Sequence, residues 1–101
     1  MDQRPIGVFD SGLGGLTAVR QLRRLLPSEH IIYFGDTARV PYGNRSREIL
    51  LKYARQDVAF LRRFDPKAVV IACGTVSSNC LHELQAENDI PVVGVVEPAV
   101  R

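Results

Sequence analysis

Short apolar runs alternate along this chain with longer segments in which apolar residues recur every three or four positions. The runs, rich in β-branched residues, are typical of buried strands and occupy residues 6–9, 30–34, 68–73 and 91–96. The segments with a helical period cover about residues 16–26, 46–64 and 76–87. Strands that alternate with helices in this way are joined by right-handed crossovers and form a parallel sheet. The pattern therefore predicts an α/β fold with helices on both faces of the sheet.

The predicted helices carry ordinary boundary signals. Pro27 ends the first helix, and Ser46 is a suitable N-cap for the second. Asp57 falls among the apolar positions of the second helix, so this acid must be paired or lie near an edge of the core. The apolar side of the first helix consists of Leu16, Val19, Leu22, Leu25 and Leu26.

The fourth predicted strand is followed by Pro98, a residue that is common at the first position of a helix. A doubly wound, flavodoxin-like sheet would be expected to continue with that helix. The length of 101 residues suits one domain or part of one. We therefore expect residues 1–101 to form an N-terminal α/β domain that is incomplete without a second α/β half.

Composition narrows the class of protein without naming a function. The net charge of +2 is too small, and its Lys and Arg too scattered, to predict a nucleic-acid surface. Cys73 and Cys80 stand seven positions apart, which fits no zinc or redox motif, so no metal site is expected. There is no apolar N-terminal segment and no run long enough to span a bilayer, which predicts a cytoplasmic protein without membrane contact.

Chemically useful residues follow the predicted strands. Because the carboxyl ends of parallel strands meet at one edge of the sheet, where open α/β folds bind ligands, these residues are expected to lie together. Cys73 stands between a strand and a helix N-terminus, which offers unpaired N–H groups and a partial positive charge. Cys73 is therefore a candidate nucleophile or base. The other residues expected at this edge are Asp10, Ser11, Asp36, Pro41, Tyr42, Gly43, Gly74, Thr75 and Glu97.

Simpler interpretations stay open for each of these residues. Cysteine is often only a packing residue, and Asp10, Ser11 or Thr75 could do no more than cap a helix. A dinucleotide site is weakened, because Thr17 stands where the third glycine of the fingerprint belongs, although Asp36 could bind a ribose. A non-catalytic amino-acid or nucleotide-binding module therefore remains the alternative to an enzyme.

Four stretches of the chain resemble glutamate racemase, a family of cofactor-independent enzymes that supply D-glutamate for peptidoglycan. They are IGVFDSGLGGLTAVRQLRRLLP at 6–27, YFGDTARVPYGNRS at 33–46, VVIACGTVSSN at 69–79 and PVVGVVEPA at 91–99. The resemblance implies two α/β halves that face each other across glutamate, with one catalytic cysteine from each half. It implies no cofactor, and the chain alone is expected to be inactive.

The resemblance also implies roles for individual residues. Cys73 corresponds to the first catalytic cysteine and Asp10 to the carboxylate that assists it. The implied substrate contacts are Ser11, Pro41, Tyr42, Gly43, Gly74 and Thr75. Gly74 stands where the family usually has asparagine, which removes a side-chain hydrogen bond to the substrate.

Two further expectations concern the rest of the molecule. The second catalytic cysteine of the family has no counterpart here. Seven residues of helix would carry Cys80 roughly 10 Å from Cys73, so we expect Cys80 to be a packing residue. The surface left by the absent half would favour self-association, so a homodimer is an expected assembly.

Overall fold

The computed structural model describes residues 2–11, 15–39 and 45–94. Its four strands form one sheet in the order β2-β1-β3-β4, and every neighbouring pair is parallel. The elements in chain order are β1 (Ile6–Asp10), α1 (Gly15–Leu25), β2 (Ile31–Gly35), the 3-10 turn η1 (Thr37–Arg39), α2 (Arg47–Arg62), β3 (Ala68–Ile71), α3 (Gly74–Glu87) and β4 (Val92–Gly94). The strand order is that of a flavodoxin-like sheet, so the predicted fold class is confirmed.

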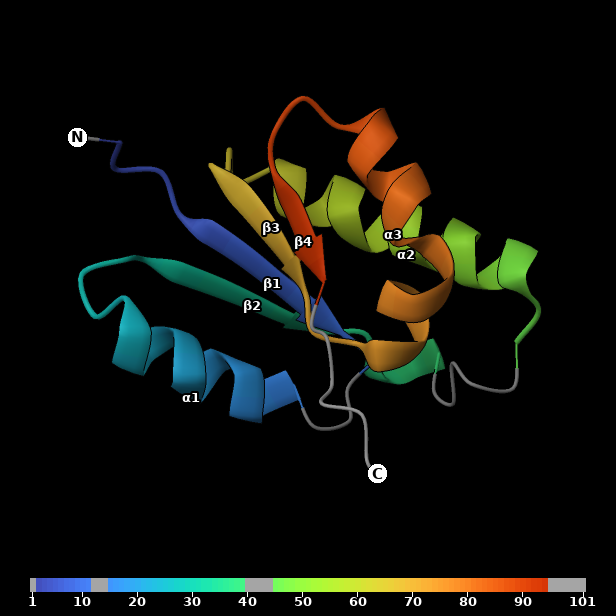
Figure 1. Cartoon of the computed structure of the whole chain (residues 1–101), viewed down its shortest axis with the longest axis horizontal. Coiled ribbons are helices and arrows are strands. Elements are labelled where there is room, and N and C mark those ends of the chain that lie inside the picture. The colour runs from blue at the N-terminus through green and yellow to red at the C-terminus, as the bar shows by residue number, and fades with distance from the viewer. Residues whose placement is uncertain (1, 12–14, 40–44, 95–101) are drawn as a thin grey trace.

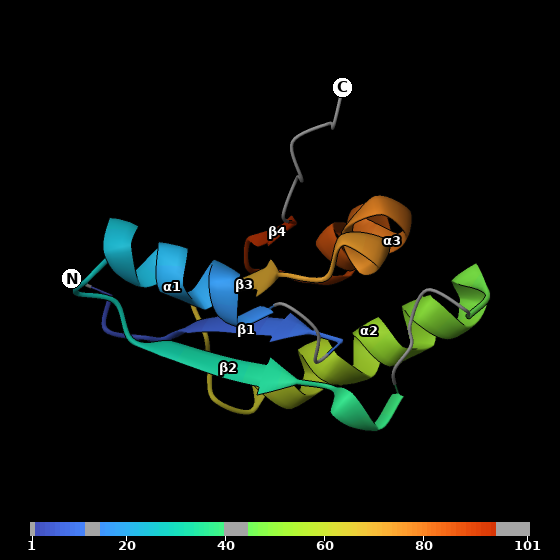
Figure 2. The same cartoon turned by 90° about the horizontal axis from the view of Figure 1, so that it is seen from below.

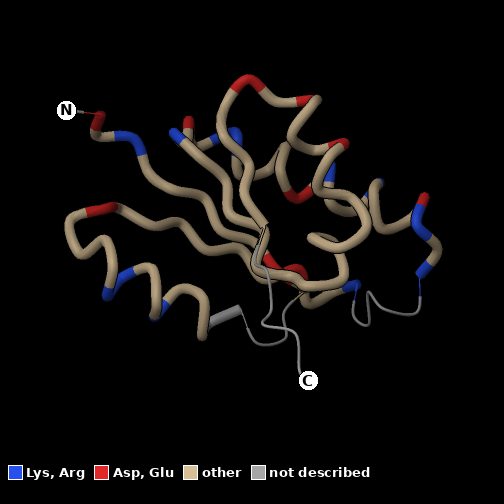
Figure 3. The backbone as a smooth tube through the Cα atoms, in the orientation of Figure 1, with Lys and Arg blue, Asp and Glu red and all other residues tan. Residues whose placement is uncertain are grey.

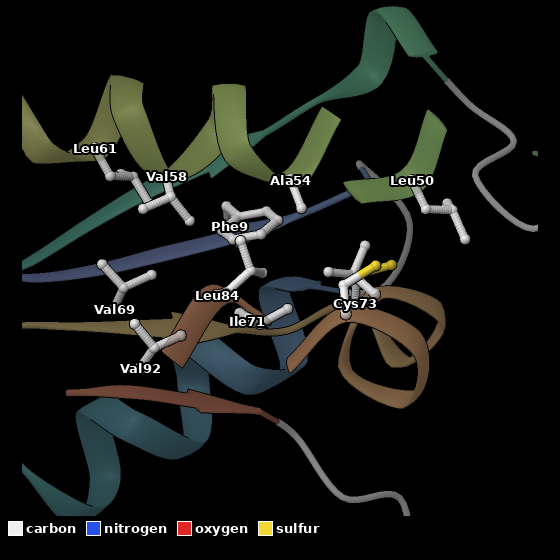
Figure 4. Close-up of a cluster of buried hydrophobic side chains, with 12 residues drawn as sticks. Phe9, Leu50, Ala54, Val58, Leu61, Val69, Ile71, Cys73, Leu84 and Val92 are labelled. Atoms are coloured by element: carbon white, nitrogen blue, oxygen red, sulfur yellow. The ribbon is translucent and has the colours of Figure 1, made fainter. Parts of the chain in front are cut away.

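The sheet lies between α1 on one face and α2 with α3 on the other, as Figures 1 and 2 show. The face of α2 and α3 carries the main core, because large apolar residues of β1 and β3 point to it. Phe9, Val69 and Ile71 are fully buried there. Figure 4 shows these strand residues beneath the apolar side of α2. The helices and β4 complete this core with Leu50, Ala54, Val58, Leu61, Val76, Cys80, Leu84 and Val92.

The opposite face is only partly covered. Val93 in β4 points away from the core and is 49% exposed, whereas its neighbour Val92 is buried. Leu25 and Leu26, at the end of the predicted apolar side of α1, are 76% and 43% exposed. The end of this apolar side therefore lies outside the core. Helix α1 packs on β1 and β2, whereas β4 is packed against α3 on the other face of the sheet.

The helix boundaries follow local chemistry. The Ser46 hydroxyl accepts a hydrogen bond from the Ile49 N–H at 3.3 Å, as a serine N-cap should. Asp57 is buried within α2, as its position among apolar residues predicts. Asp65 adopts a left-handed backbone with φ 52°, a conformation that aspartate tolerates, and this turns the chain from α2 towards β3.

Two predicted boundaries were wrong by a few residues. The third helix begins at Gly74 rather than Val76, because Cys73, with its extended backbone, is the N-cap. The third strand ends at Ile71, two residues before its predicted end. The fourth strand covers Val92–Gly94, so it begins one residue after the predicted Pro91, and residues 95–96 of its predicted range lie outside the described residues.

Candidate functional site

The ends of β1, β2 and β3 meet at the carboxyl edge of the sheet, as parallel strands require. The Ala72 N–H donates to the Phe9 carbonyl at 2.8 Å, which extends the pairing of β1 with β3 by one residue. On the other side of β1, the Asp36 N–H donates to the Asp10 carbonyl at 3.0 Å. Figure 3 shows acidic positions gathered where these strands end. The expected convergence of Asp10, Asp36 and Cys73 at one edge is therefore confirmed.

Cys73 occupies the N-cap position of α3. Its backbone is extended, with φ −92° and ψ 116°, and its carbonyl accepts the Ser77 N–H at 2.9 Å. The side chain makes no capping hydrogen bond. Gly74 and Thr75 form the first turn of the helix, so Thr75 is not the cap. Both are partly exposed. The thiol thus lies at a helix start, where N–H groups are unpaired within the helix.

The Cys73 thiol is nevertheless buried. Its residue is only 7% exposed and belongs to the same apolar cluster as Leu50 and Val76. Figure 4 shows Cys73 at the end of this cluster, beside Leu50. The sulfur therefore lies at the rim of the sheet, as predicted, but among apolar side chains.

Asp10 ends β1 and is fully buried. The Tyr33 hydroxyl donates a hydrogen bond of 2.7 Å to Asp10 Oδ1. Burial, the hydrogen bond and the nearby Asp10 charge together raise the pKa of Tyr33 to about 12. The phenol therefore remains protonated, and able to donate, at neutral pH.

Tyr33 is a functional candidate that sequence reasoning missed. Tyr33 in β2 pairs with Val8 in β1, and Val8 and Asp10 point to the same face because they are two residues apart. The Tyr33 and Asp10 side chains therefore both lie on the α1 face. A tyrosine within an otherwise apolar strand needs a partner for its hydroxyl. The need of this hydroxyl for a partner could have identified Tyr33 from the sequence, since Asp10 is the acid at the end of the neighbouring strand.

Asp10 and Cys73 leave the sheet on opposite faces. Asp10 shares the α1 face with Val8 and Tyr33, whereas Cys73 follows Ile71 by one alternation and packs with α2. The two side chains therefore share an edge, and each approaches it from its own layer.

Ser77 fixes the first turns of α3 against the sheet. Its hydroxyl donates to the Ile71 carbonyl, the last of β3, at 3.1 Å. Gly94 in β4 lies so close that an added Cβ would stand 2.9 Å from Ser77 Oγ. The position of the helix that begins next to Cys73 therefore depends on a serine and on a glycine two strands from β1.

The other predicted site residues divide into two groups. Ser11 follows Asp10 at the edge and is 8% exposed. Pro41, Tyr42, Gly43 and Glu97 lie outside the described residues.

Within residues 2–11, 15–39 and 45–94 no group of three His, Cys, Asp or Glu side chains could hold a metal ion. No helix in the same ranges is long and apolar enough to cross a membrane.

Asp36, the candidate ribose ligand of the dinucleotide alternative, has a different environment. Its carboxylate lies 3.7 Å from the Arg39 guanidinium, which in turn stacks on the Tyr53 ring at 4.4 Å from the centroid. In dinucleotide-binding sheets the third strand lies beyond the second. Here β3 pairs with β1 instead. The topology therefore argues against the dinucleotide alternative.

Cys80 is fully buried in α3 and belongs to the main core. Burial raises the pKa of this thiol, so it stays protonated at neutral pH. The prediction that Cys80 is a packing residue is confirmed.

These observations define an α/β domain of flavodoxin-like topology with a thiol and a buried carboxylate at the carboxyl edge of its sheet. Comparison with known sequences identifies relatives of that class. The chain is 55% identical over 97 residues to glutamate racemase of Thermus thermophilus, and 53% identical over 94 residues to that of Chlorobaculum tepidum. These matches cover 96% and 92% of this chain but only 38% and 35% of the relatives. No family model matches the sequence.

Solved structures give the same result. The crystal structure of glutamate racemase from Thermus thermophilus in complex with β-chloro-D-alanine superposes with a TM-score of 0.89 at 53% identity. That of Francisella tularensis, in complex with D-glutamate, gives a TM-score of 0.86 at 50% identity. The superpositions cover 94% and 93% of this chain and 37% and 36% of those chains. This chain is therefore a homologue of part of the glutamate racemases and spans about a third of their length.

Proposed function

We propose that this chain provides one thiol and one side of the substrate site of a cofactor-independent glutamate racemase that makes D-glutamate for peptidoglycan. The observation that carries the proposal is the edge at which Cys73 begins α3 beside the end of β1 with Asp10. The similarity to glutamate racemases supports glutamate as the substrate, because one of the superposed structures contains D-glutamate.

Racemisation without a cofactor requires two groups, a base and an acid. Inversion at an α-carbon without a cofactor needs a base that removes the proton from one face and an acid that returns a proton to the other. A thiol suits this task because its reference pKa of about 8.5 is near neutrality. In this proposal Cys73 acts on one face of the substrate, and polypeptide outside the 101 residues supplies the opposing thiol.

The backbone supplies the charge stabilisation. The N–H groups in the first turn of α3, at Gly74 and Thr75, are directed at the edge where negative charge develops on the substrate carboxylate. Asp10 would bind the substrate ammonium or accept a proton from it. Glycine at position 74 removes one side-chain donor that the family usually has, so glutamate binding should rely more on these backbone groups.

The test is a chimera in which residues 1–101 replace the matching stretch of the Thermus thermophilus enzyme. The proposal expects this chimera to exchange the α-hydrogen of glutamate with deuterated water. Cys73→Ala should lower the exchange by about 10²-fold or more, the usual contribution of a general base. Cys80→Ala is the matched control, since it removes a buried sulfur from the same helix, and it should change the rate less than about threefold. Exchange at the parental rate in the Cys73 variant would exclude Cys73 from the reaction.

A binding module without chemistry is the second candidate, and the burial of the Cys73 thiol favours it. A folded chimera without activity, next to an active Thermus thermophilus enzyme, would support this alternative. Calorimetry of the chimera with glutamate and with a nucleotide would then separate an amino-acid site from a nucleotide site. The 101-residue chain alone should not interconvert the enantiomers. A decay of the circular dichroism of D-glutamate that is linear in chain concentration would contradict that expectation.

A further inference from the structure

We propose that Tyr33 is a positioning residue for Asp10, and that position 35 must be glycine to leave room for it. The proposal rests on the proposed function in one respect, since it takes the Asp10 carboxylate to face the substrate. The three residues Asp10, Tyr33 and Gly35 are called the carboxylate unit below.

The strand register explains why Tyr33 can hold Asp10. In the parallel pairing of β1 with β2, Val8 stands opposite Tyr33 and Asp10 stands opposite Gly35. The Tyr33 side chain lies on the same face as Asp10 and must reach two residues along the strand. The length of the phenol allows its hydroxyl to come within 2.7 Å of Asp10 Oδ1.

Gly35 supplies the space that this reach needs. A Cβ built at position 35 would stand 3.0 Å from the Tyr33 hydroxyl oxygen and 3.5 Å from Asp10 Oδ1. Any side chain at this position would therefore press first on the hydroxyl that donates the hydrogen bond. The glycine lies directly opposite Asp10, so a side chain there would approach both atoms of the hydrogen bond.

Burial strengthens the dependence of Asp10 on the hydrogen bond from Tyr33. Asp10 is fully buried, and a buried carboxylate depends on the donors around it because water is excluded. Hydrogen bonds to charged groups are also stronger than those between neutral groups. Removal of the Tyr33 hydroxyl would therefore take one donor from Oδ1 of this carboxylate and weaken the control of its orientation at the edge.

The first test measures the contact itself in the 101-residue chain. The ¹³Cζ signal of Tyr33 is assigned as the one that Tyr33→Phe removes, and its ionisation is followed by NMR at pH values where far-UV circular dichroism matches that at pH 8. At pH 11 a phenol with a pKa of about 12 is roughly 10% ionised, whereas one with the ordinary value of about 10 is roughly 90% ionised. Asp10→Asn should move the titration towards the ordinary value. An ordinary titration in the parent chain would overturn the proposal.

The second test asks whether Tyr33 acts through Asp10, using the chimera defined above. Tyr33→Phe and Gly35→Ala should each lower the glutamate exchange rate about tenfold or more. In an Asp10→Asn background, neither change should lower the residual rate further, because the group that they position has lost its charge. Tyr53→Phe removes a hydroxyl from α2 on the opposite face of the sheet and should leave the rate within about twofold.

The outcomes separate this inference from the proposed function. Equal losses in the parent chimera and in the Asp10→Asn background would mean that Tyr33 only stabilises the fold, and would overturn the inference while the racemase assignment stands. No loss in the Tyr33→Phe variant would do the same. A folded parent chimera without exchange would refute the proposed function, and with it the role of Asp10 that the carboxylate unit serves.

Discussion

Replacing Leu61 by alanine should weaken the contact between α2 and β1, and the cost should depend on the glycine that faces it. Leu61 is 1% exposed, and a Cβ added at Gly7 would lie 3.3 Å from Leu61 Cδ1 and 3.4 Å from its Cβ and Cδ2. Leu61→Ala removes three buried carbon groups, worth about 2.4 kcal/mol of transfer free energy. The cavity that remains raises the expected loss to about 3 kcal/mol.

The effect of Gly7→Ala on the free energy of unfolding should have opposite signs in the parent chain and in the Leu61→Ala variant. In the parent chain the new methyl presses on Leu61, which costs about 1–3 kcal/mol and outweighs the gain of about 0.4–1 kcal/mol from restricting the unfolded chain. In the Leu61→Ala background two of the three close atoms are gone, so only the gain and some filling of the cavity remain. We therefore expect Gly7→Ala to destabilise the parent by about 1 kcal/mol and to stabilise the variant by about 1 kcal/mol.

The assay is urea denaturation of the four proteins, followed by far-UV circular dichroism, with the free energy of unfolding taken by linear extrapolation. The double-mutant cycle then measures a coupling of about 2 kcal/mol. Similar slopes for all four proteins are the control, since they show that the unfolded states are comparable. If Gly7→Ala destabilised both backgrounds equally, the described contact between β1 and α2 would be wrong.

Three further predictions concern the helices. Ser46→Ala should lower the free energy of unfolding by about 1 kcal/mol through loss of the hydrogen bond to the Ile49 N–H, while Ser46→Asp should retain most of it in the same urea assay. The Arg55 guanidinium lies 2.9 Å from Glu87 Oε1 and lowers the pKa of that carboxyl below its ordinary value of 4.5. Glu87 therefore stabilises the fold at pH values above 4.5, and this contribution is lost as the pH falls through the lower pKa of the folded state. Glu87→Gln should therefore lower the free energy of unfolding by less than about 1 kcal/mol at pH 7, because the ion pair is exposed. The difference between the parent and the variant should vanish in acid, and a constant difference down to about pH 2 would contradict the ion pair. Iodoacetamide at pH 7.5 should label Cys73 before Cys80, whose pKa is raised by burial, and peptide mass spectrometry showing the reverse order would contradict the described burial.

The pattern of apolar residues was sufficient to predict the sheet. The four apolar runs rich in β-branched residues predicted where the strands lie, although not which residues pair. The strands and helices alternate along the chain, so right-handed crossovers leave few possible arrangements. Cys73, Asp10 and Asp36 were expected at one edge for the same reason, and they lie there.

Side-chain direction was harder to predict than position. The sequence indicates that Cys73 follows a strand, but the burial of its thiol results from an apolar cluster that includes residues of a different helix, among them Leu50. Tyr33 was overlooked because its partner is determined by the register between β1 and β2. The exposure of Leu25 depends on what covers the face of α1, which the periodicity of a single helix does not determine.

The close approach of Gly94 to Ser77 has a consequence for tolerance to mutation. Even the smallest side chain at position 94 would push on the hydroxyl that ties α3 to the end of β3, and this displacement would reach the residue that begins the helix. A strand position with no chemical group of its own should therefore tolerate replacement poorly. Gly94→Ala should therefore lower the free energy of unfolding in the urea assay, and an unchanged value would contradict the described contact with Ser77.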